Sequence, residues 1–280
     1  MKKAILIVSF GTTHEDTRKA TIDVIESRIK KEFEGYEVKM CYTSHIILKR
    51  LKENYGIYVD TPEEALNKLA DEGYEEVYLQ PLHLIPGEEF DYIKKVTFHQ
   101  FLNKFKVIKI GRPLLYFKSE EEDIPDDYTI LLEAMNNYIP KDRAVVLMGH
   151  GSAHPSNSVY SCFESVLVDE GYDKVYMATV EGYPTLDRAI KFLNKNNHKK
   201  VTLMPFMFVA GDHAKHDMAG DEEDSWKVIL SELGFDVDII LKGIGEFPEV
   251  QDIYIEHLHD IIEGKYCHVG KTKKGMKKRK

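Results

Sequence analysis

The stretch AVVLMGHGS at residues 144–152 decides the fold, because an apolar run of the kind that is buried ends abruptly in two glycines that flank a histidine. A parallel strand that is covered on both faces reads as such a continuous apolar run. Ligands of parallel sheets bind beyond the carboxyl ends of the strands. His150 is therefore placed where a ligand is expected, although a turn residue or a helix cap is the alternative for one isolated histidine.

Outward from this stretch, apolar runs alternate with helical patterns along the whole chain. The predicted strands cover residues 4–9, 37–42, 76–85, 106–110, 143–149, 174–180, 199–209 and 236–241. Helical spacing of apolar residues predicts helices at 22–33 and 250–261. The sequence Thr61-Pro62-Glu63-Glu64 offers an N-cap, a first-turn proline and a capping-box glutamate, so another helix begins there. Strands that alternate with helices predict an α/β fold with parallel sheets.

The eight predicted strands form two sets of four that resemble each other. SFGT at 9–12 matches GHGS at 149–152, and VYLQPLHLIPGEE at 77–89 matches VTLMPFMFVAGDH at 201–213 in the same order. We therefore expect two similar Rossmann-like halves, each with a four-stranded parallel sheet flanked by helices. The acidic, proline-containing segment at 119–127 is the natural linker. The expected units are an N-terminal half at 1–125, a C-terminal half at 126–264 and a disordered basic tail at 265–280, and the final helix could cross back to the first half.

The composition restricts the class of protein. The chain has 280 residues, 43% of them hydrophobic, and a net charge of −9, while its last ten residues hold seven Lys and Arg and no acid. The acidic remainder argues against a nucleic-acid surface. The three cysteines form no CxxC pair, which favours a reduced, cytoplasmic protein. No run approaches the roughly 20 apolar residues that span a bilayer, and the apolar stretch at 4–8 is too short for a signal peptide.

Three polar side chains follow strands of the second half. His150 follows its first strand, Glu181 in VEGYP its second, and His213 in AGDH its third. With neighbouring strands ~4.8 Å apart, we expect the three loops to lie roughly 5–10 Å from one another. Two imidazoles and a carboxylate suit cobalt, iron, nickel or zinc with positions open for a substrate. The alternatives are that Glu181 caps a helix that opens near Pro184 and that His213 only begins an exposed acidic loop.

Other residues compete for these roles or extend the site. The same loops contain further polar side chains, which we rank as supporting or solvated groups: His154, Asp212, His216, Asp217 and residues 221–224. His83 is either a core histidine or part of a cleft, and the repeat places Glu89 opposite His213. The turns SFGTT and GHGS offer backbone amides that could cradle an anion. They are not nucleotide-binding fingerprints, and GHGSAH lacks a nucleophile elbow.

At these residues the sequence resembles the anaerobic sirohydrochlorin cobaltochelatases of cobalamin biosynthesis (CbiK type), relatives of the ferrochelatases. The resemblance covers nearly the whole chain, and its strings are KKAILIVSFGT (2–12), DTPEEALNKLADEGY (60–74), LHLIPGEEFDYI (82–93), MGHGS (148–152), VEGYP (180–184), LMPFMFVAGDHAKHDMAGDEEDSWK (203–227) and GIGEFP (243–248). It implies a tetrapyrrole cleft between the two halves. It also implies insertion of Co²⁺ into sirohydrochlorin, or into precorrin-2 or factor II, without ATP or an organic cofactor.

The resemblance implies that His150, Glu181 and His213 hold the metal and that Glu89 handles substrate or metal. An imidazole with a pKa near ~6.5 can accept a pyrrole proton at neutral pH, so His150 is also suited to act as the base. Phe10 takes the first-half position equivalent to His150 and is the expected wall for the ring. Expected substrate contacts are Phe10, Gly11, Thr12, His83, Gly151 and Ser152. Insertion of Fe²⁺ or Ni²⁺, a non-catalytic tetrapyrrole or metal carrier, and a homo-oligomer remain open.

Overall fold

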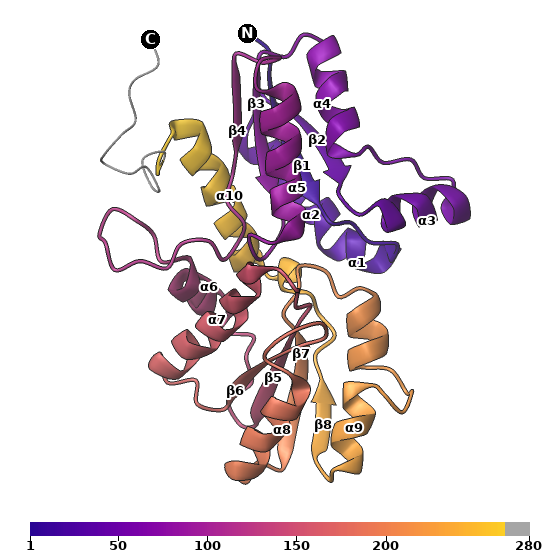
Figure 1. The fold of residues 1–280 in the computed structure, drawn as a ribbon, viewed down its shortest axis with the longest axis vertical. Helices are drawn as coiled ribbons and strands as arrows, with labels where there is room; N and C mark the ends of the chain where they lie inside the picture. The colour runs from indigo at the N-terminus through magenta and orange to yellow at the C-terminus, as the bar shows by residue number, and fades with distance from the viewer. Residues whose placement is uncertain (267–280) are drawn as a thin grey trace.

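The computed structural model of the protein describes residues 1–266, so most of the predicted basic tail, together with Cys267, lies outside the described residues. Two α/β halves are stacked along the long axis of the molecule (Figure 1). The first sheet has the strand order β2-β1-β3-β4 and the second the order β6-β5-β7-β8, with all pairings parallel. The predicted fold class is therefore confirmed.

All eight predicted strands are present. Those of the first sheet are β1 (Lys3–Ser9), β2 (Glu37–Tyr42), β3 (Glu76–Pro81) and β4 (Val107–Ile110). Those of the second sheet are β5 (Ala144–Gly149), β6 (Val175–Thr179), β7 (Lys200–Pro205) and β8 (Asp236–Ile239). The first strand of each half, β1 or β5, lies inside its sheet between the second and third strands of that half. Both halves therefore present equivalent strand ends to the region between them.

Two strands end four residues earlier than the sequence predicts. We expected β3 to reach residue 85 and β7 to reach residue 209, but they stop at Pro81 and Pro205. Proline has no N–H to continue a ladder. One further hydrogen bond follows each proline, from Leu82 N to Val8 O at 2.8 Å and from Phe206 N to Met148 O at 2.7 Å. The chain then leaves both sheets, and His83 lies beyond the strand rather than inside it.

Helices alternate with the strands along the chain, as the sequence predicted. Their bounds are α1 (Glu15–Ala20), α2 (Ile22–Glu32), α3 (His45–Tyr55), α4 (Pro62–Asp71), α5 (Glu88–Val96), α6 (Asp127–Met135), α7 (Ser158–Asp169), α8 (Leu186–Lys195), α9 (Trp226–Glu232) and α10 (Pro248–Glu263), with short turns η1 (Thr97–Phe101), η2 (Pro155–Asn157), η3 (His213–Met218) and η4 (Ile244–Glu246). The predicted capping box is complete, because Thr61 and Glu64 each accept the other's backbone N–H at the start of α4.

The alternation of side chains along each strand divides the core into three parts. Leu6 and Val8 of β1 pack in a core with α4 and α5, and Val146 and Met148 of β5 pack in a core with α8 and α9. The opposite faces of both sheets join one continuous core that includes residues of α2, α6, α7 and α10. This shared core fixes the two halves relative to each other.

Helix α10 crosses from the second half onto the first sheet, as the sequence left open (Figure 1). Tyr254 of α10 is fully buried and donates its hydroxyl to Leu82 O at 3.2 Å. His257 is also buried, 1% exposed, with its Nδ1 donating to Arg112 O at 3.2 Å, so it serves packing and not solvent contact. Arg112 itself forms buried ion pairs with α6 and α10. The crossing helix therefore helps to hold the segments that follow β3 and β4.

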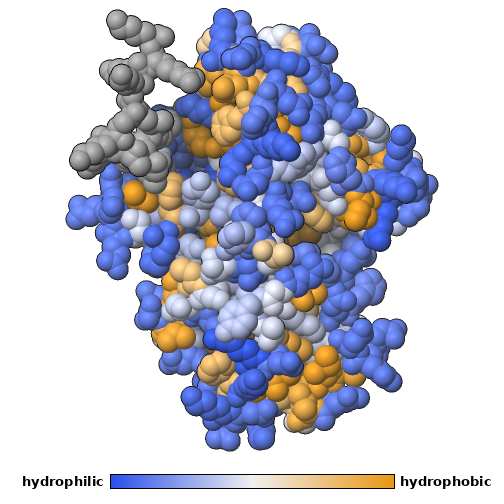
Figure 2. Space-filling model, in the orientation of Figure 1, coloured by the Kyte–Doolittle hydropathy of each residue, from blue (hydrophilic) through white to orange (hydrophobic). Residues whose placement is uncertain are grey.

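The visible face of the molecule is mostly hydrophilic, with apolar residues in small separate groups (Figure 2). Within residues 1–266, no helix has both the length and the apolar character needed to cross a bilayer.

Candidate active site

His150 is placed by two loops that are hydrogen-bonded to each other. Beyond the end of β5, Val180 N donates to Gly149 O at 3.1 Å and Glu181 N donates to His150 O at 2.8 Å. Gly151 has a φ of +84°, and a Cβ on it would lie 2.5 Å from the Glu181 carbonyl oxygen. Only glycine combines this left-handed backbone with such a close approach. The glycine after His150 therefore allows the β5 and β6 loops to meet.

The structure brings together the three side chains that were expected to converge. Ligand atoms of His150, Glu181 and His213 all lie within 4.8 Å of one another. The two imidazole rings are 4.8 Å apart between centroids and nearly perpendicular, at 82°. All three side chains are partly exposed, so an ion or substrate can reach them. This spacing is compatible with one divalent ion bound by two imidazoles and a carboxylate.

Hydrogen bonds fix which ring nitrogen of each histidine is available. His150 Nδ1 lies 2.8 Å from Gly151 O, and His213 Nδ1 lies 2.5 Å from a carboxylate oxygen of Asp217. A carbonyl and a carboxylate can only accept, so both Nδ1 atoms carry the hydrogen. The Nε2 atom of each ring then keeps its lone pair for a metal or a proton. Partners on the far nitrogen are typical of metal-binding histidines.

The alternatives for Glu181 and His213 are wrong. The helix after Glu181 is α8, and its N-cap is Thr185, whose hydroxyl accepts from Arg188 N at 3.3 Å. The Glu181 side chain makes no hydrogen bond or ion pair with the described residues. His213 begins η3 rather than a loop, and this turn places Asp217 beside it.

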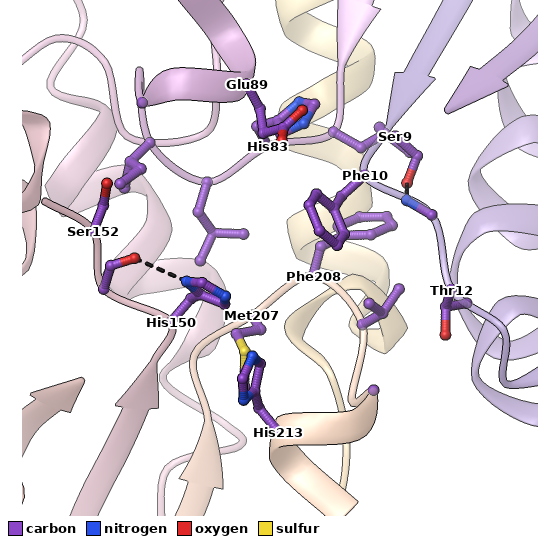
Figure 3. Close-up of a pocket in the computed structure, with 18 of the residues that line it drawn as sticks. Ser9, Phe10, Thr12, His83, Glu89, His150, Ser152, Met207, Phe208 and His213 are labelled. Atoms are coloured by element: carbon purple, nitrogen blue, oxygen red, sulfur yellow. Dashed lines mark hydrogen bonds between the residues drawn. The ribbon is translucent and has the colours of Figure 1, made fainter. Parts of the chain in front are cut away.

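The three side chains face a cleft of about 500 Å³ that both halves line. Every residue predicted for the site lines this cleft: Phe10, Gly11, Thr12, His83, Glu89, His150, Gly151, Ser152, Glu181 and His213. Figure 3 shows Phe10, His83 and Glu89 extending into it from the first half, and His150 and His213 from the second. The volume lies within the range of small-molecule sites.

The first-half wall combines an apolar ring with two polar groups. Phe10 is 43% exposed, which is high for an aromatic side chain in an interior cleft. Burial lowers the pKa of His83 to about 4, so its ring is neutral near pH 7. His83 Nε2 lies 3.5 Å from Thr43 Oγ1, and its Nδ1 is buried without a partner among the described residues. Glu89 is the second residue of α5 and is half-buried.

The expectation that backbone amides of the two turns receive anions is wrong for three of them. Gly11 N already donates to Ser9 Oγ at 3.1 Å, Gly151 N to the Tyr160 hydroxyl at 3.4 Å, and Ser152 N to Asn157 Oδ1 at 3.0 Å. These bonds hold the turns in shape. These three amides are therefore not free to receive a ligand carboxylate.

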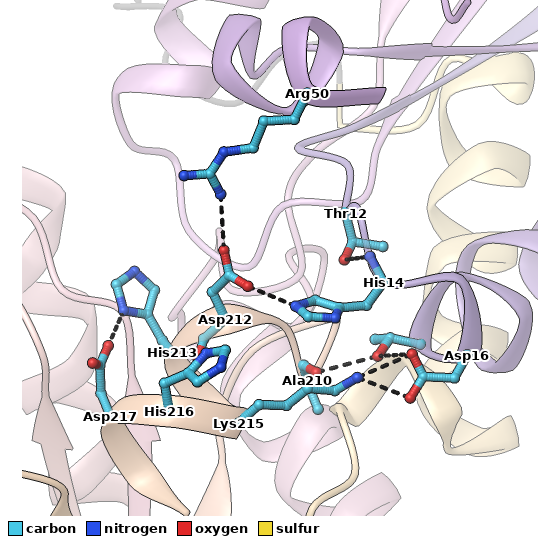
Figure 4. Close-up of polar contacts among 11 residues, drawn as sticks. Thr12, His14, Asp16, Arg50, Ala210, Asp212, His213, Lys215, His216 and Asp217 are labelled. Atoms are coloured by element: carbon cyan, nitrogen blue, oxygen red, sulfur yellow. Dashed lines mark hydrogen bonds and ion pairs between the residues drawn. The ribbon is translucent and has the colours of Figure 1, made fainter. Parts of the chain in front are cut away.

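A polar network that the sequence did not indicate begins at Asp212, beside His213 (Figure 4). Asp212 accepts from His14 Nε2 at 2.6 Å and from Arg50 Nη1 at 3.1 Å, and both donors belong to the first half. No local pattern identifies His14 or Arg50, because their partner is far away in the chain. The remaining histidines of these loops have other partners, His154 with Asp91 and His216 with the Asp212 carbonyl.

Two similar α/β halves around a cleft, with imidazoles and a carboxylate at the strand ends of one half, define the class of two-lobed α/β metal chelatases. Solved structures with this fold include SirB from Bacillus subtilis with Fe³⁺, at 17% identity and a TM-score of 0.62 over 95% of this chain and 99% of that one. A second is the sirohydrochlorin chelatase SirB from B. subtilis subspecies spizizenii in complex with cobalt, at 14% identity and a TM-score of 0.61 over 94% and 97%.

The chain belongs to the cobalt chelatase (CbiK) family, whose family model matches residues 3–263. It is 36% identical to the sirohydrochlorin cobaltochelatase of Salmonella typhimurium over 94% of this chain and 97% of that one. It is 33% identical to the sirohydrochlorin cobaltochelatase CbiKC of Nitratidesulfovibrio vulgaris over 92% and 89%. The predicted family is thus confirmed.

Proposed function

We propose that this chain is a sirohydrochlorin cobaltochelatase, which inserts Co²⁺ into sirohydrochlorin in cobalamin biosynthesis. One observation carries the proposal: the ligand atoms of His150, Glu181 and His213 lie within 4.8 Å of one another and face a cleft lined by both halves. The family and the names of both relatives support cobalt as the inserted metal and sirohydrochlorin as the ring.

In this proposal the second half holds the metal substrate. The Nε2 atoms of His150 and His213 and the carboxylate of Glu181 bind Co²⁺ and leave positions open for ring nitrogens. Asp217 accepts the Nδ1 hydrogen of His213, which orients the ring and leaves Nε2 for the metal. The Gly151 carbonyl orients His150 in the same way, with a neutral acceptor in place of a charged one.

Insertion also requires the ring to lose two pyrrole protons. A metal-bound imidazole cannot accept a proton at the same time, so His150 takes the two roles in sequence. His213 and Glu181 hold the ion while His150 releases it and takes a proton through Nε2, as a neutral imidazole can. Glu89, a carboxylate that lines the cleft from the first-half wall, takes the second proton.

The first half supplies the surface for the ring. Phe10 offers an exposed aromatic face, and Gly11, Thr12 and His83 lie around it on the same wall. Gly151 and Ser152 line the cleft from the second half. A flat tetrapyrrole held between these walls has the aromatic side chain on one face and the metal ligands on the other. This arrangement brings the metal to the ring from a single side.

We further infer an ATP-independent reaction, because neither strand-to-helix turn has a nucleotide-binding fingerprint. A cytoplasmic location is supported by the free thiols of Cys41 and Cys162. We retain residues 1–125 and 126–264 as the two halves, since each range contains one complete sheet.

Iron or nickel insertion uses the same ligand types. A carrier is the contrasting function, and it needs metal ligands but no proton acceptor.

The test is to mix purified protein, sirohydrochlorin and Co²⁺ anaerobically, without nucleotide, and to follow the absorbance change of metal insertion. The proposal expects a rate well above that of buffer, with multiple turnovers. The same assay with Fe²⁺ and Ni²⁺ ranks the metals. A protein that binds the ring but gives only the buffer rate would be a carrier, and the proposed function would be wrong.

A further inference from the structure

The charge of the cleft conflicts with the charge of the proposed substrate. Sirohydrochlorin carries carboxylate side chains around its ring. The described residues that line the cleft include the acids Glu88, Glu89, Glu181 and Asp212, but no lysine and no arginine. Burying like charges next to one another is unfavourable unless cations are present. The substrate therefore needs cationic groups from just outside the lining residues.

Within residues 1–266, Arg50 is the arginine whose side chain forms an ion pair with a residue that lines the cleft. It extends from α3 toward Asp212, and Ile47 on the preceding turn of α3 lines the cleft (Figure 4). Its Nη1 donates to Asp212 Oδ2 at 3.1 Å. The other oxygen of the same carboxylate accepts from His14 Nε2 at 2.6 Å. One carboxylate of the second half thus occupies two donors of the first half.

This network is open to solvent. The side chains of Arg50 and Asp212 are 52% and 47% exposed, and that of His14 is 24% exposed. Water can therefore solvate Asp212 if it leaves its partners. An incoming carboxylate can accept the same hydrogen bonds, so the exchange replaces one carboxylate with another and leaves neither donor without a partner.

We propose that Arg50 and His14 form a receptor for a carboxylate of the tetrapyrrole and that Asp212 occupies this receptor until the substrate displaces it. This inference rests on the proposed function, because it takes sirohydrochlorin as the ligand. It assigns specificity for a polycarboxylate ring to two side chains of the first half, which meet the second half at Asp212, the residue before the metal ligand His213. Arg50 is then a binding residue that takes no part in proton transfer.

The competing explanation is that the Arg50–Asp212 pair only fastens the two halves together. The chain offers a matched control for this explanation. Arg28 of α2 pairs with Asp252 of α10 and donates to Gln251 Oε1 at 3.0 Å, so it too connects first-half and second-half segments. Neither Arg28 nor Asp252 lines the cleft.

The experiment measures binding of metal-free sirohydrochlorin to the full chain, anaerobically and by absorbance titration, for wild type, Arg50→Gln, Asp212→Asn and Arg28→Gln. The steady-state KM and kcat for cobalt insertion are measured alongside. We expect Arg50→Gln to raise Kd and KM roughly ten-fold, the loss of one charge-assisted contact, with kcat unchanged. Asp212→Asn should leave Kd unchanged or lower it, because the competing carboxylate is gone. Arg28→Gln should bind as wild type does, and melting curves confirm that each variant is folded.

Two results would overturn the inference. One is an Arg50→Gln variant whose Kd lies within two-fold of wild type. The other is an Asp212→Asn variant that weakens binding as much as Arg50→Gln does, since a simple fastening contact is lost equally from either side. If wild type itself fails to bind sirohydrochlorin, the proposed function fails, and that outcome is distinguishable from both.

Discussion

Phe10 and His150 occupy equivalent positions in the two halves: each follows the first strand of its half, β1 or β5, and each precedes a glycine with positive φ. The angles are +93° at Gly11 and +84° at Gly151. The flanking strands agree as well, because Pro81 pairs with Val8 and Pro205 with Met148, the next-to-last residues of β1 and β5. The same backbone turn therefore presents an aromatic ring from one half and an imidazole from the other.

This relationship predicts the effect of Phe10→Ala. Removing the ring takes away an apolar face of the cleft, which is worth ~1.5–3 kcal/mol if the side chain is fully covered by substrate. We expect the KM for sirohydrochlorin to rise about ten-fold with little change in Co²⁺ affinity. Phe98→Ala, at an exposed phenylalanine that does not line the cleft, is the control. An unchanged KM in Phe10→Ala would show that the tetrapyrrole does not contact Phe10.

Gly151→Ala should disable the site, because the new Cβ would meet the Glu181 carbonyl oxygen at 2.5 Å. The matched control is Gly171→Ala, since Gly171 has a similar φ of +80° but nothing within 4 Å of a Cβ. The control bears only the left-handed backbone cost of roughly 1–2 kcal/mol. Urea unfolding and Co²⁺ titration should show a larger stability loss and weaker metal binding in Gly151→Ala. Equal effects of the two variants would contradict the close packing of these loops.

Asp217→Asn should weaken Co²⁺ binding by roughly 10–100-fold, because the amide no longer holds the Nδ1 hydrogen of His213 with a full negative charge. Equilibrium titration with Co²⁺, followed by its absorption bands, measures this change. Asp236→Asn, at the opposite end of the second sheet, removes the same charge from the protein and should bind as wild type does. If both variants bind equally, Asp217 has no role in orienting His213.

Protonation of His83 should couple stability to pH. The folded pKa is about 4 because of burial, whereas an exposed histidine has its pKa near 6.5, so the folded state binds fewer protons between these values. The part of the free energy of unfolding that depends on neutral His83 is fully present above pH 6.5. It is lost as the pH falls toward 4, by up to about 3 kcal/mol. Urea unfolding at pH 7 and pH 4.5 should show a smaller drop for His83→Gln than for wild type. The exposed His216, replaced by Gln, is the control, and equal drops in all three proteins would refute the coupling.

The strands were predictable because buried parallel strands have continuous apolar sequences, and the convergence of His150, Glu181 and His213 followed from the shared edge of parallel strand ends. The ends of β3 and β7 were also readable in principle, since Pro81 and Pro205 cannot continue a ladder.

The contacts between the halves were not predictable. Arg50 and Asp212 are 162 residues apart, and His14 and Asp212 are 198 residues apart. Their meeting depends on how the shared core and α10 orient one sheet against the other. Sequence spacing contains no information about that orientation. The turns were predicted correctly, but the internal partners of their amides depend on Tyr160 and Asn157, which only the folded chain brings near.

The kcat of anaerobic cobalt insertion by His150→Ala, measured beside His154→Ala, tests most directly whether His150 acts as metal ligand and base. Both residues lie in the loop that follows β5, but His154 pairs with Asp91 at 3.3 Å. His154 does not belong to the cluster of His150, Glu181 and His213. We expect His150→Ala to lose at least about 100-fold in kcat, the usual contribution of a positioned base, while it remains folded and His154→Ala stays close to wild type. A fully active His150→Ala would contradict the placement of the reaction at this strand end.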